Sequence, residues 1–307
     1  GRLTIKVYSA GELVPALECL GAVANGTAQM GHDAAYYHAG KSEGCAFFTA
    51  FPFGFTMGEM AAWIKHGNGQ KLWDELYAPF GIRGFQAGST GTQMFGWFRR
   101  EIRSLADLDG LKFRTPGNQG RVLQKLGVTP VSLPGGEIFP ALQSGAIDGA
   151  EWVGPYNDLA LGFYQVCRYY YSPGYHEPGP ALQLTVNEQA WRSLPPDLQA
   201  IVHAAADAAT TDMYAEYTAQ SGPALRTLVQ KHGVIVRSLP EDVLIACGEK
   251  SNEVLNEIHA GDTSPNRIVR RIIEDFLAFR NEVIPWTRVG EQAFVNARRL
   301  PFEFKLK

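Results

Sequence analysis

The sequence predicts an α/β fold of two domains that one long helix spans. Its 307 residues exceed the usual size of a single core, so two domains are expected. Apolar strand-like segments alternate with helical segments over the first half of the chain, as in domains built on a largely parallel sheet. One helical pattern then runs over 195–232. At 1.5 Å per residue it would be roughly 55 Å long, which exceeds one small domain.

Short strands are predicted where apolar or alternating residues are bounded by turn-forming residues. The segment 2–8 alternates apolar and polar side chains, and the strand that ends at Ala150 follows a helix stop at Gly145. The predicted strands cover 2–8, 82–87, 111–114, 128–132, 147–150, 180–187 and 234–238. Their short connections to the helices are typical of βαβ units.

Helices are predicted from apolar periodicity and from start and stop signals. Thr56 and Glu59 have the spacing of a capping box. Pro196 suits the first turn of the long helix, and Gly233 ends it. The predicted helices cover about 12–24, 56–65, 70–79, 117–126, 135–144, 154–162, 195–232, 240–259 and 264–283.

Composition and motifs exclude several classes of protein. Hydrophobic residues make up 45% and charged residues 19% of the chain, and the net charge is −3 without any run of Lys or Arg, so no nucleic acid or anionic membrane is expected as a partner. The four cysteines have neither zinc-like nor disulfide-like spacing. No apolar stretch is long enough to span a bilayer. The sequence also has no motif of a common hydrolase, zinc protease, dinucleotide site or P-loop, which makes an enzyme less expected.

Candidate site residues follow two of the predicted strands. Arg114 ends one strand before a stiff Thr-Pro-Gly turn, and Glu151 and Trp152 stand where the strand 147–150 ends. In open α/β sheets the carboxyl ends of strands face the ligand crevice. The planar guanidinium of Arg114 suits the capture of a carboxylate, with a structural ion pair as the alternative. For Glu151 the alternative is a solvated strand end.

Two loops add further candidates. Gln93 lies in a small-residue turn that could present backbone N–H groups to an anion, which is a weak signal by itself. Glu177 stands between two Pro-Gly pairs, and its position before proline biases it to an extended conformation that aims its carboxylate. His176 is expected to be a packed histidine rather than a ligand. The candidate site thus consists of fixed polar groups and two aromatic residues, which suit the binding of a ligand rather than its catalytic conversion. They are Gln93, Arg114, Glu151, Glu177, Tyr37 and Trp152.

Four separated motifs resemble one protein family. Residues 105–114 and 141–152 resemble the solute-binding subunit of TRAP (tripartite ATP-independent periplasmic) transporters, the DctP-like family. Residues 91–98 and 175–179 resemble its branch that binds 2-oxo acids or lactate together with a metal ion. The resemblance covers nearly the whole chain. The resemblance implies that the first strand and helix of the family, and its signal peptide, stand ahead of Gly1. Either the chain is a trimmed form or its first domain lacks an element.

The resemblance implies a periplasmic receptor with a two-domain periplasmic binding protein-like fold. We expect 1–88 with 152–182 to form the first domain, 89–151 with 183–240 to form the second, and the helices of 240–307 to pack across both. Such a receptor closes over a small monocarboxylate and delivers it to the small and large permease subunits in the membrane. Any homodimer contact is expected in the C-terminal helices.

The resemblance also implies roles for individual residues. Arg114 matches the arginine that pairs with the ligand carboxylate, and Tyr37 matches an aromatic hydrogen-bond donor to the ligand. Gln93 matches an amide that contacts both metal and ligand. The metal ligands implied are Gln93, Glu151, the backbone of Trp152, and Glu177.

Charge counting favours a cation at such a site. Glu151, Glu177 and a ligand carboxylate would bring three negative charges to a closed site where Arg114 supplies one positive charge, and uncompensated buried charge is very costly. A divalent ion gives neutrality and a monovalent ion leaves one negative charge. Calcium is therefore slightly favoured over sodium, and oxygen ligands suit both ions.

Two other functions stay open at this point. One is a metal-dependent lyase or aldolase acting on 2-oxo acids, which would need a positioned acid or base, and His176 is the only histidine near the proposed site. The other is the ligand-sensing domain of a membrane receptor. The sequence does not choose among pyruvate, longer 2-oxo acids and lactate, because the depth of the pocket depends on packing.

Overall fold

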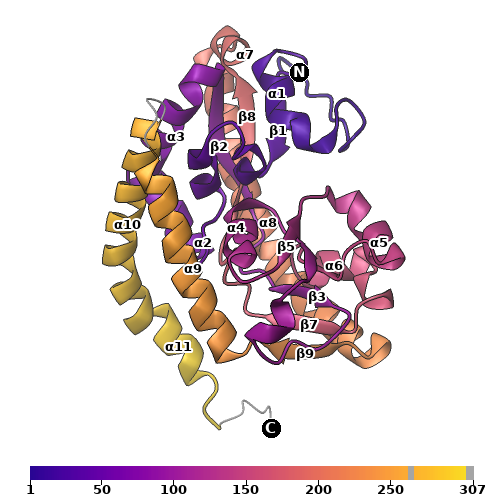
Figure 1. Ribbon diagram of the computed structural model, residues 1–307. Helices are drawn as coiled ribbons and strands as arrows, with labels where there is room; N and C mark the ends of the chain where they lie inside the picture. Colours follow the sequence, from indigo (N-terminus) through magenta and orange to yellow (C-terminus); the bar gives the residue numbers. More distant parts are fainter. Residues whose placement is uncertain (262–265, 302–307) are drawn as a thin grey trace, which may run out of the picture.

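The strands of the protein form two separate sheets (Figure 1). The computed structural model describes residues 1–261 and 266–301. We call the three-stranded sheet the upper sheet. Its strands are antiparallel, in the order β1 (Met30–Asp33), β8 (Ala181–Asn187) and β2 (Ile82–Ser89).

The lower sheet is mixed and has the strand order β5-β4-β6-β3-β7-β9. Its centre pairs β4 in parallel with both β5 and β6, whereas β3 runs antiparallel to β6 and β7. The strands are β3 (Gly96–Phe98), β4 (Lys112–Arg114), β5 (Thr129–Val131), β6 (Gly149–Ala150), β7 (Tyr169–Ser172) and β9 (Ile235–Ser238). Because β4 and β6 are parallel neighbours, residues that follow them emerge at the same edge of the sheet.

The helices cover the faces of both sheets, and most lie where the sequence predicts them. The α-helices are α1 (Cys19–Ala24), α2 (Met57–His66), α3 (Gly69–Tyr77), α4 (Gly117–Gln124), α5 (Gly135–Ser144), α6 (Pro155–Leu161), α7 (Glu188–Ser193), α8 (Pro196–His232), α9 (Glu241–Ala260), α10 (Asn266–Val289) and α11 (Glu291–Ala297). The predicted capping box of α2 is confirmed, since the Thr56 N–H donates to the Glu59 carboxylate at 2.8 Å. The first residues of the helix predicted at 264–283 lie outside the described residues.

The long helix α8 connects the two sheets. Near its start, Val202 and Ala206 pack with Phe85 of β2. Near its end, Leu228 packs with Trp97 of β3. The predicted spanning helix is therefore confirmed: its 37 residues contact the cores of both sheets.

The C-terminal helices α9 and α10 run next to each other along one side of the molecule (Figure 1). Phe276 of α10 packs against Phe55 and Trp63, with ring centroids 4.3 Å and 5.6 Å away. Val243 and Val254 of α9 belong to the same buried cluster. This cluster is the largest core of the described chain, and it includes residues of both sheets as well as of the C-terminal helices.

The strand predicted at residues 2–8 is wrong. Ile5 is 57% and Val7 is 83% exposed, and no strand of the described chain pairs with this segment. An alternating pattern forms a strand only where a neighbouring strand supplies hydrogen bonds and one face is buried.

The sheets also divide the chain differently from the predicted domains. β7 lies within 152–182, which we expected in the first domain, but it pairs with β3 and β9 in the lower sheet. β8 falls mainly within 183–240, which we expected in the second domain, but it pairs with β1 and β2 in the upper sheet. Strand pairing joins segments that are far apart in the chain. The alternation of strands and helices along the sequence does not show which strands pair. The domain boundaries themselves stay a proposal.

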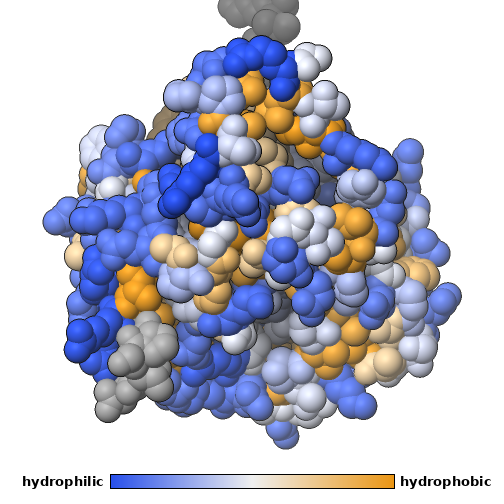
Figure 2. Space-filling model, turned by 90° about the horizontal axis from the view of Figure 1, so that it is seen from above, coloured by the Kyte–Doolittle hydropathy of each residue, from blue (hydrophilic) through white to orange (hydrophobic). Residues whose placement is uncertain are grey.

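The surface seen from above is largely hydrophilic, and its hydrophobic residues occur as separate small patches (Figure 2). Scattered apolar residues of this kind are ordinary on folded proteins. None of the described helices combines the length and the hydropathy that crossing a membrane requires.

Candidate ligand and metal site

Two buried charges face each other at the edge of the lower sheet. Arg114 ends β4 and Glu151 follows β6, and their side chains are 1% and 0% exposed. Nη1 of Arg114 donates to the Glu151 carboxylate at 2.6 Å and to the Glu151 carbonyl at 3.0 Å, while Nε donates to the Leu133 carbonyl at 3.0 Å. The guanidinium is therefore fixed, and only Nη2 makes no hydrogen bond within the described residues. Arg114 thus forms the structural ion pair that was considered as an alternative to ligand binding. Only part of its guanidinium is free to bind a ligand.

The loop between β7 and β8 brings a second carboxylate to the same place. Suitable atoms of Glu151, His176 and Glu177 all lie within 4.8 Å of one another, and the three residues are buried. His176 Nε2 is 3.6 Å from the Glu151 carboxylate. Oε2 of Glu151 and Oε2 of Glu177 have no hydrogen-bond partner in the described part of the chain. Two buried glutamates thus share one arginine.

Glycines allow this loop to pack closely on its neighbours. A Cβ at Gly174 would lie 2.3 Å from the Gln93 carbonyl oxygen, and a Cβ at Gly179 would lie 2.0 Å from the backbone nitrogen of Met57. The Gly174 N–H donates to the Gln93 carbonyl, and the Gln93 N–H donates to the Glu177 carbonyl at 3.1 Å. The backbone contacts at Gly174 and Gly179 hold Glu177 beside Gln93.

The electrostatics of the cluster follow from burial and from the crowding of carboxylates. Burial, and next the charge of Glu151, raise the pKa of Glu177 well above its usual range, although Arg114 opposes this. Burial works against a charged Arg114, but Glu151, Tyr37 and Tyr36 outweigh it and raise the pKa of the guanidinium. Without a further cation, the site therefore favours one uncharged carboxyl group.

A cavity of about 210 Å³ opens beside this cluster. Tyr37, Gln93, Trp152 and Glu177 line it, and the guanidinium of Arg114 lies 5.1 Å from the Trp152 ring centre. Gln93 Nε2 donates to the Thr90 hydroxyl at 3.1 Å, while Gln93 Oε1 makes no hydrogen bond within the described residues. The structure thus brings all six predicted site residues, Tyr37, Gln93, Arg114, Glu151, Trp152 and Glu177, to one place.

Sequence reasoning missed several residues of this site. Tyr36 lines the cavity beside Tyr37, with ring centroids 4.7 Å apart, and Asp33, Asn157 and Tyr217 complete the wall. No local signal marks Asp33, Asn157 or Tyr217. A signal did exist for Tyr36, since it adjoins Tyr37 in the segment that precedes the apolar run 45–51.

The residues present fit a hard cation. Glu151, Glu177 and Gln93 each have a buried oxygen without a hydrogen-bond partner in the described residues. Calcium takes oxygen ligands at about 2.3–2.6 Å, so two ligands on opposite sides of one ion lie about 5 Å apart. The 4.8 Å span of the cluster agrees with this. His176 fits less well, because imidazole suits transition metals and zinc.

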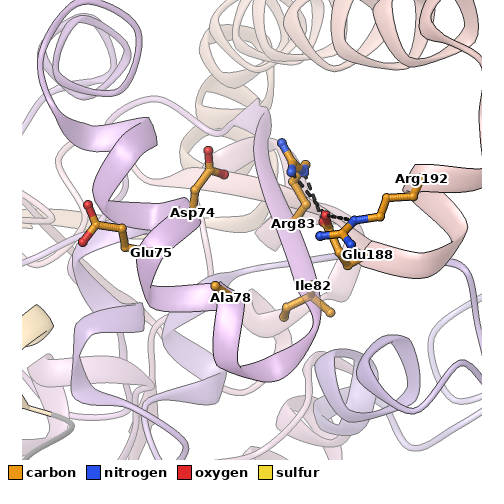
Figure 3. A pocket seen from close by; sticks show the side chains of 7 residues that line it. All are labelled: Asp74, Glu75, Ala78, Ile82, Arg83, Glu188 and Arg192. Atoms are coloured by element: carbon orange, nitrogen blue, oxygen red, sulfur yellow. Dashed lines mark hydrogen bonds and ion pairs between the residues drawn. The ribbon is translucent and has the colours of Figure 1, made fainter.

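A second hollow, of about 350 Å³, lies outside this site (Figure 3). Glu188 accepts hydrogen bonds there from both Arg83 and Arg192. Asp74 and Glu75 of α3 form its other side. Glu188 pairs with both arginines and Glu75 pairs with Arg271, and these groups are partly exposed, so the hollow resembles an ordinary charged surface rather than a binding site.

Two sheets joined by a spanning helix, with a buried charged site beside a cavity where they meet, define a solute-binding protein. The family model of the DctP group, bacterial extracellular solute-binding proteins of family 7, matches residues 1–262, and this chain belongs to that family. The monocarboxylate 2-oxoacid-binding periplasmic protein of Nostoc sp. is 42% identical over 296 residues, which are 96% of this chain and 80% of that protein.

Solved structures of TRAP transporter solute-binding proteins are similar to this chain. The protein of Bordetella bronchiseptica is 38% identical with a TM-score of 0.94, covering 97% of this chain and 87% of that chain, and is described as a mixed-occupancy dimer with copurified calcium and picolinate. The protein of Pseudoalteromonas atlantica, with bound sodium and pyruvate, is 40% identical with a TM-score of 0.88 over 94% of this chain and 85% of that chain. The protein of Colwellia psychrerythraea, with bound calcium and pyruvate, is 41% identical with a TM-score of 0.88 over 92% of this chain and 85% of that chain.

These comparisons confirm the family and the α/β fold that the sequence predicts. They also confirm that the chain is a binding protein rather than an enzyme, since members of this family are solute receptors. The lyase or aldolase alternative is therefore not retained.

Proposed function

We propose that this chain is the receptor of a TRAP transporter and binds a small 2-oxo monocarboxylate, such as pyruvate, together with a calcium ion. The observation that carries the proposal is the pair of buried carboxylates, Glu151 and Glu177, beside the single arginine Arg114 at a cavity of about 210 Å³. Relatives of 38–42% identity that are described with calcium, sodium, pyruvate or 2-oxo acids support it.

In this proposal Arg114 binds the carboxylate of the solute through Nη2. Its other nitrogens are held by Glu151 and by the Leu133 carbonyl, so the guanidinium cannot turn away from the cavity. Tyr37 and Gln93 line the same wall and supply hydrogen bonds to the solute. Charge-assisted bonds of this kind give a carboxylate both affinity and orientation.

The cation is held by Glu151, Glu177, the side-chain oxygen of Gln93 and the backbone carbonyl of Trp152. It offsets the negative charge that the two glutamates and the solute bring together, which supports calcium over sodium. A 2-oxo acid has a carboxylate oxygen and a neighbouring carbonyl oxygen that suit the same hard ion. A 2-hydroxy acid such as lactate has a similar pair of oxygens and is the alternative solute.

Members of this family are extracytoplasmic, and we propose that this chain passes its solute to the small and large membrane subunits of a permease. We also propose a homodimer through the C-terminal helices. Trp286, Val289 and Phe294 of α10 and α11 are 70%, 72% and 64% exposed, and such clustered apolar side chains are typical of an interface. The Bordetella bronchiseptica relative is described as a dimer, which supports a homodimer as such.

The test combines the identification of bound ligands with titration. Mass spectrometry and elemental analysis of the purified protein are expected to find a small 2-oxo or 2-hydroxy acid and calcium. Isothermal titration after exhaustive chelation is expected to show that pyruvate affinity falls and that added calcium restores it. Undiminished pyruvate affinity in the chelated protein would refute the role of the cation. Failure to bind any small carboxylate in the presence of calcium would refute the proposed function.

A further inference from the structure

The cavity has an acidic residue that the proposed cation site does not use. Asp33 and Glu177 are the two acidic residues of its wall, and Glu177 is already assigned to the cation. In the described parts of the chain, no lysine or arginine lines this cavity. Arg114, whose guanidinium lies 5.1 Å from the ring centre of the lining residue Trp152, is the cationic group that the proposed function assigns to the first carboxylate of the solute.

Asp33 is held in place from behind the cavity wall. Gln183 Nε2 donates to Asp33 Oδ1 at 2.6 Å, and His38 Nε2 lies 2.6 Å from Asp33 Oδ2. The Tyr77 hydroxyl in turn donates to Gln183 Oε1 at 2.7 Å. Gln183, His38 and Tyr77 are 0%, 4% and 0% exposed, whereas 9% of the Asp33 side chain stays exposed. The carboxylate is therefore fixed beside the cavity, because any rotation would break buried hydrogen bonds.

The chemistry of this wall distinguishes solutes by charge. Gln183, His38 and the Cys19 thiol are hydrogen-bonding partners of the Asp33 carboxylate, and an ionised carboxylate cannot itself donate a hydrogen bond. A neutral or hydroxylated solute chain can lie against it. A second carboxylate on the solute would meet a like charge, and no lysine or arginine of the described residues lines the cavity to offset it.

We propose that Asp33 is a specificity-determining residue that excludes 2-oxo acids carrying a second carboxylate. The inference rests on the proposed function, because it assumes that Arg114 and the cation hold the first carboxylate. It assigns to the network of Asp33, His38 and Gln183 a role in solute selection in addition to its structural role.

The test measures the binding of three solutes by titration calorimetry in the presence of calcium. These are pyruvate, 2-oxoglutarate and the 5-amide of 2-oxoglutarate, which has the size of the dicarboxylate without its second charge. In the parent protein the amide is expected to bind at least about tenfold more tightly than 2-oxoglutarate. If the amide and 2-oxoglutarate bind equally weakly, the size of the solute and not its second charge excludes the dicarboxylate. This result from the parent protein would by itself refute the inference.

Substitution then assigns the effect to one residue. In Asp33→Asn the preference for pyruvate over 2-oxoglutarate is expected to fall at least about tenfold. The matched control is His38→Gln, which disturbs the same buried network and leaves the Asp33 charge, and it is expected to keep the preference of the parent. Equal relaxation in both variants, or none in Asp33→Asn, would refute the role of Asp33. A parent protein that binds none of the three solutes would instead refute the proposed function.

Discussion

Replacing Glu177 with glutamine removes one negative charge from the cation site and keeps the shape of the side chain. With a bound monocarboxylate, the parent site carries a charge of −2 from Glu151, Glu177, Arg114 and the solute, which one calcium ion neutralises. The variant carries −1, which one sodium ion neutralises. The change is therefore expected to shift the preference of the site from calcium towards sodium.

The size of this shift follows from the spacing of the cluster. One carboxylate oxygen of Glu151 and one of Glu177 lie within 4.8 Å of each other, so an ion between them is no farther than that from Glu177. At this distance, and with an effective dielectric constant of about 20, one unit of charge interacts with another by about 3.5 kcal/mol. The second positive charge of calcium loses this interaction in the variant. The calcium-over-sodium preference is expected to fall by roughly two orders of magnitude after partial compensation by solvent.

The assay is isothermal titration of calcium, and separately of sodium, into chelated protein saturated with pyruvate. Glu188→Gln is the control, because it makes the same substitution at a glutamate that lies at the second hollow, where Glu188 accepts hydrogen bonds from Arg83 and Arg192 (Figure 3). The control is expected to bind calcium as the parent does. Unchanged calcium affinity in Glu177→Gln, with the fold intact by circular dichroism, would refute the assignment of Glu177 to the cation site.

Three further predictions follow from the structure. Arg114→Lys keeps the charge that Glu151 needs but loses the planar fork, so pyruvate affinity is expected to fall at least about tenfold in calorimetry, and parent-like affinity would exclude Arg114 as the solute anchor. Burial raises the pKa of Asp158 to about 6, above the ordinary value of about 3.9, so its contribution to stability is present below pH 4 and falls by about 3 kcal/mol in total as the pH rises through 6. Urea unfolding of Asp158→Asn is expected to lack this part of the pH dependence, and an unaltered slope would contradict the raised pKa. Trp286→Glu is expected to turn a dimer into a monomer in sedimentation, whereas a parent that is already monomeric would remove the proposed interface.

Elements with local signals could be predicted from the sequence alone. The capping box of Thr56 and Glu59 begins α2 as predicted, because both partners lie within one turn. The site residues at strand ends were also predictable. Arg114 is the last residue of β4 and Glu151 follows β6, and two strands that run in parallel bring the residues at their ends to one edge of a sheet.

Features that depend on pairing between distant segments could not be predicted in this way. The segment 2–8 has the pattern of a strand but no described neighbour to pair with, and the pairing of β7 in the lower sheet and of β8 in the upper sheet has no local signal. The same holds within the site. Nothing local to Arg114 shows that Glu151 occupies part of its fork, and nothing local to Asp33 shows that it lines the cavity. Hydrogen bonds and burial between residues far apart in the chain are set by the packing of whole elements, so a pattern of neighbouring residues does not contain them.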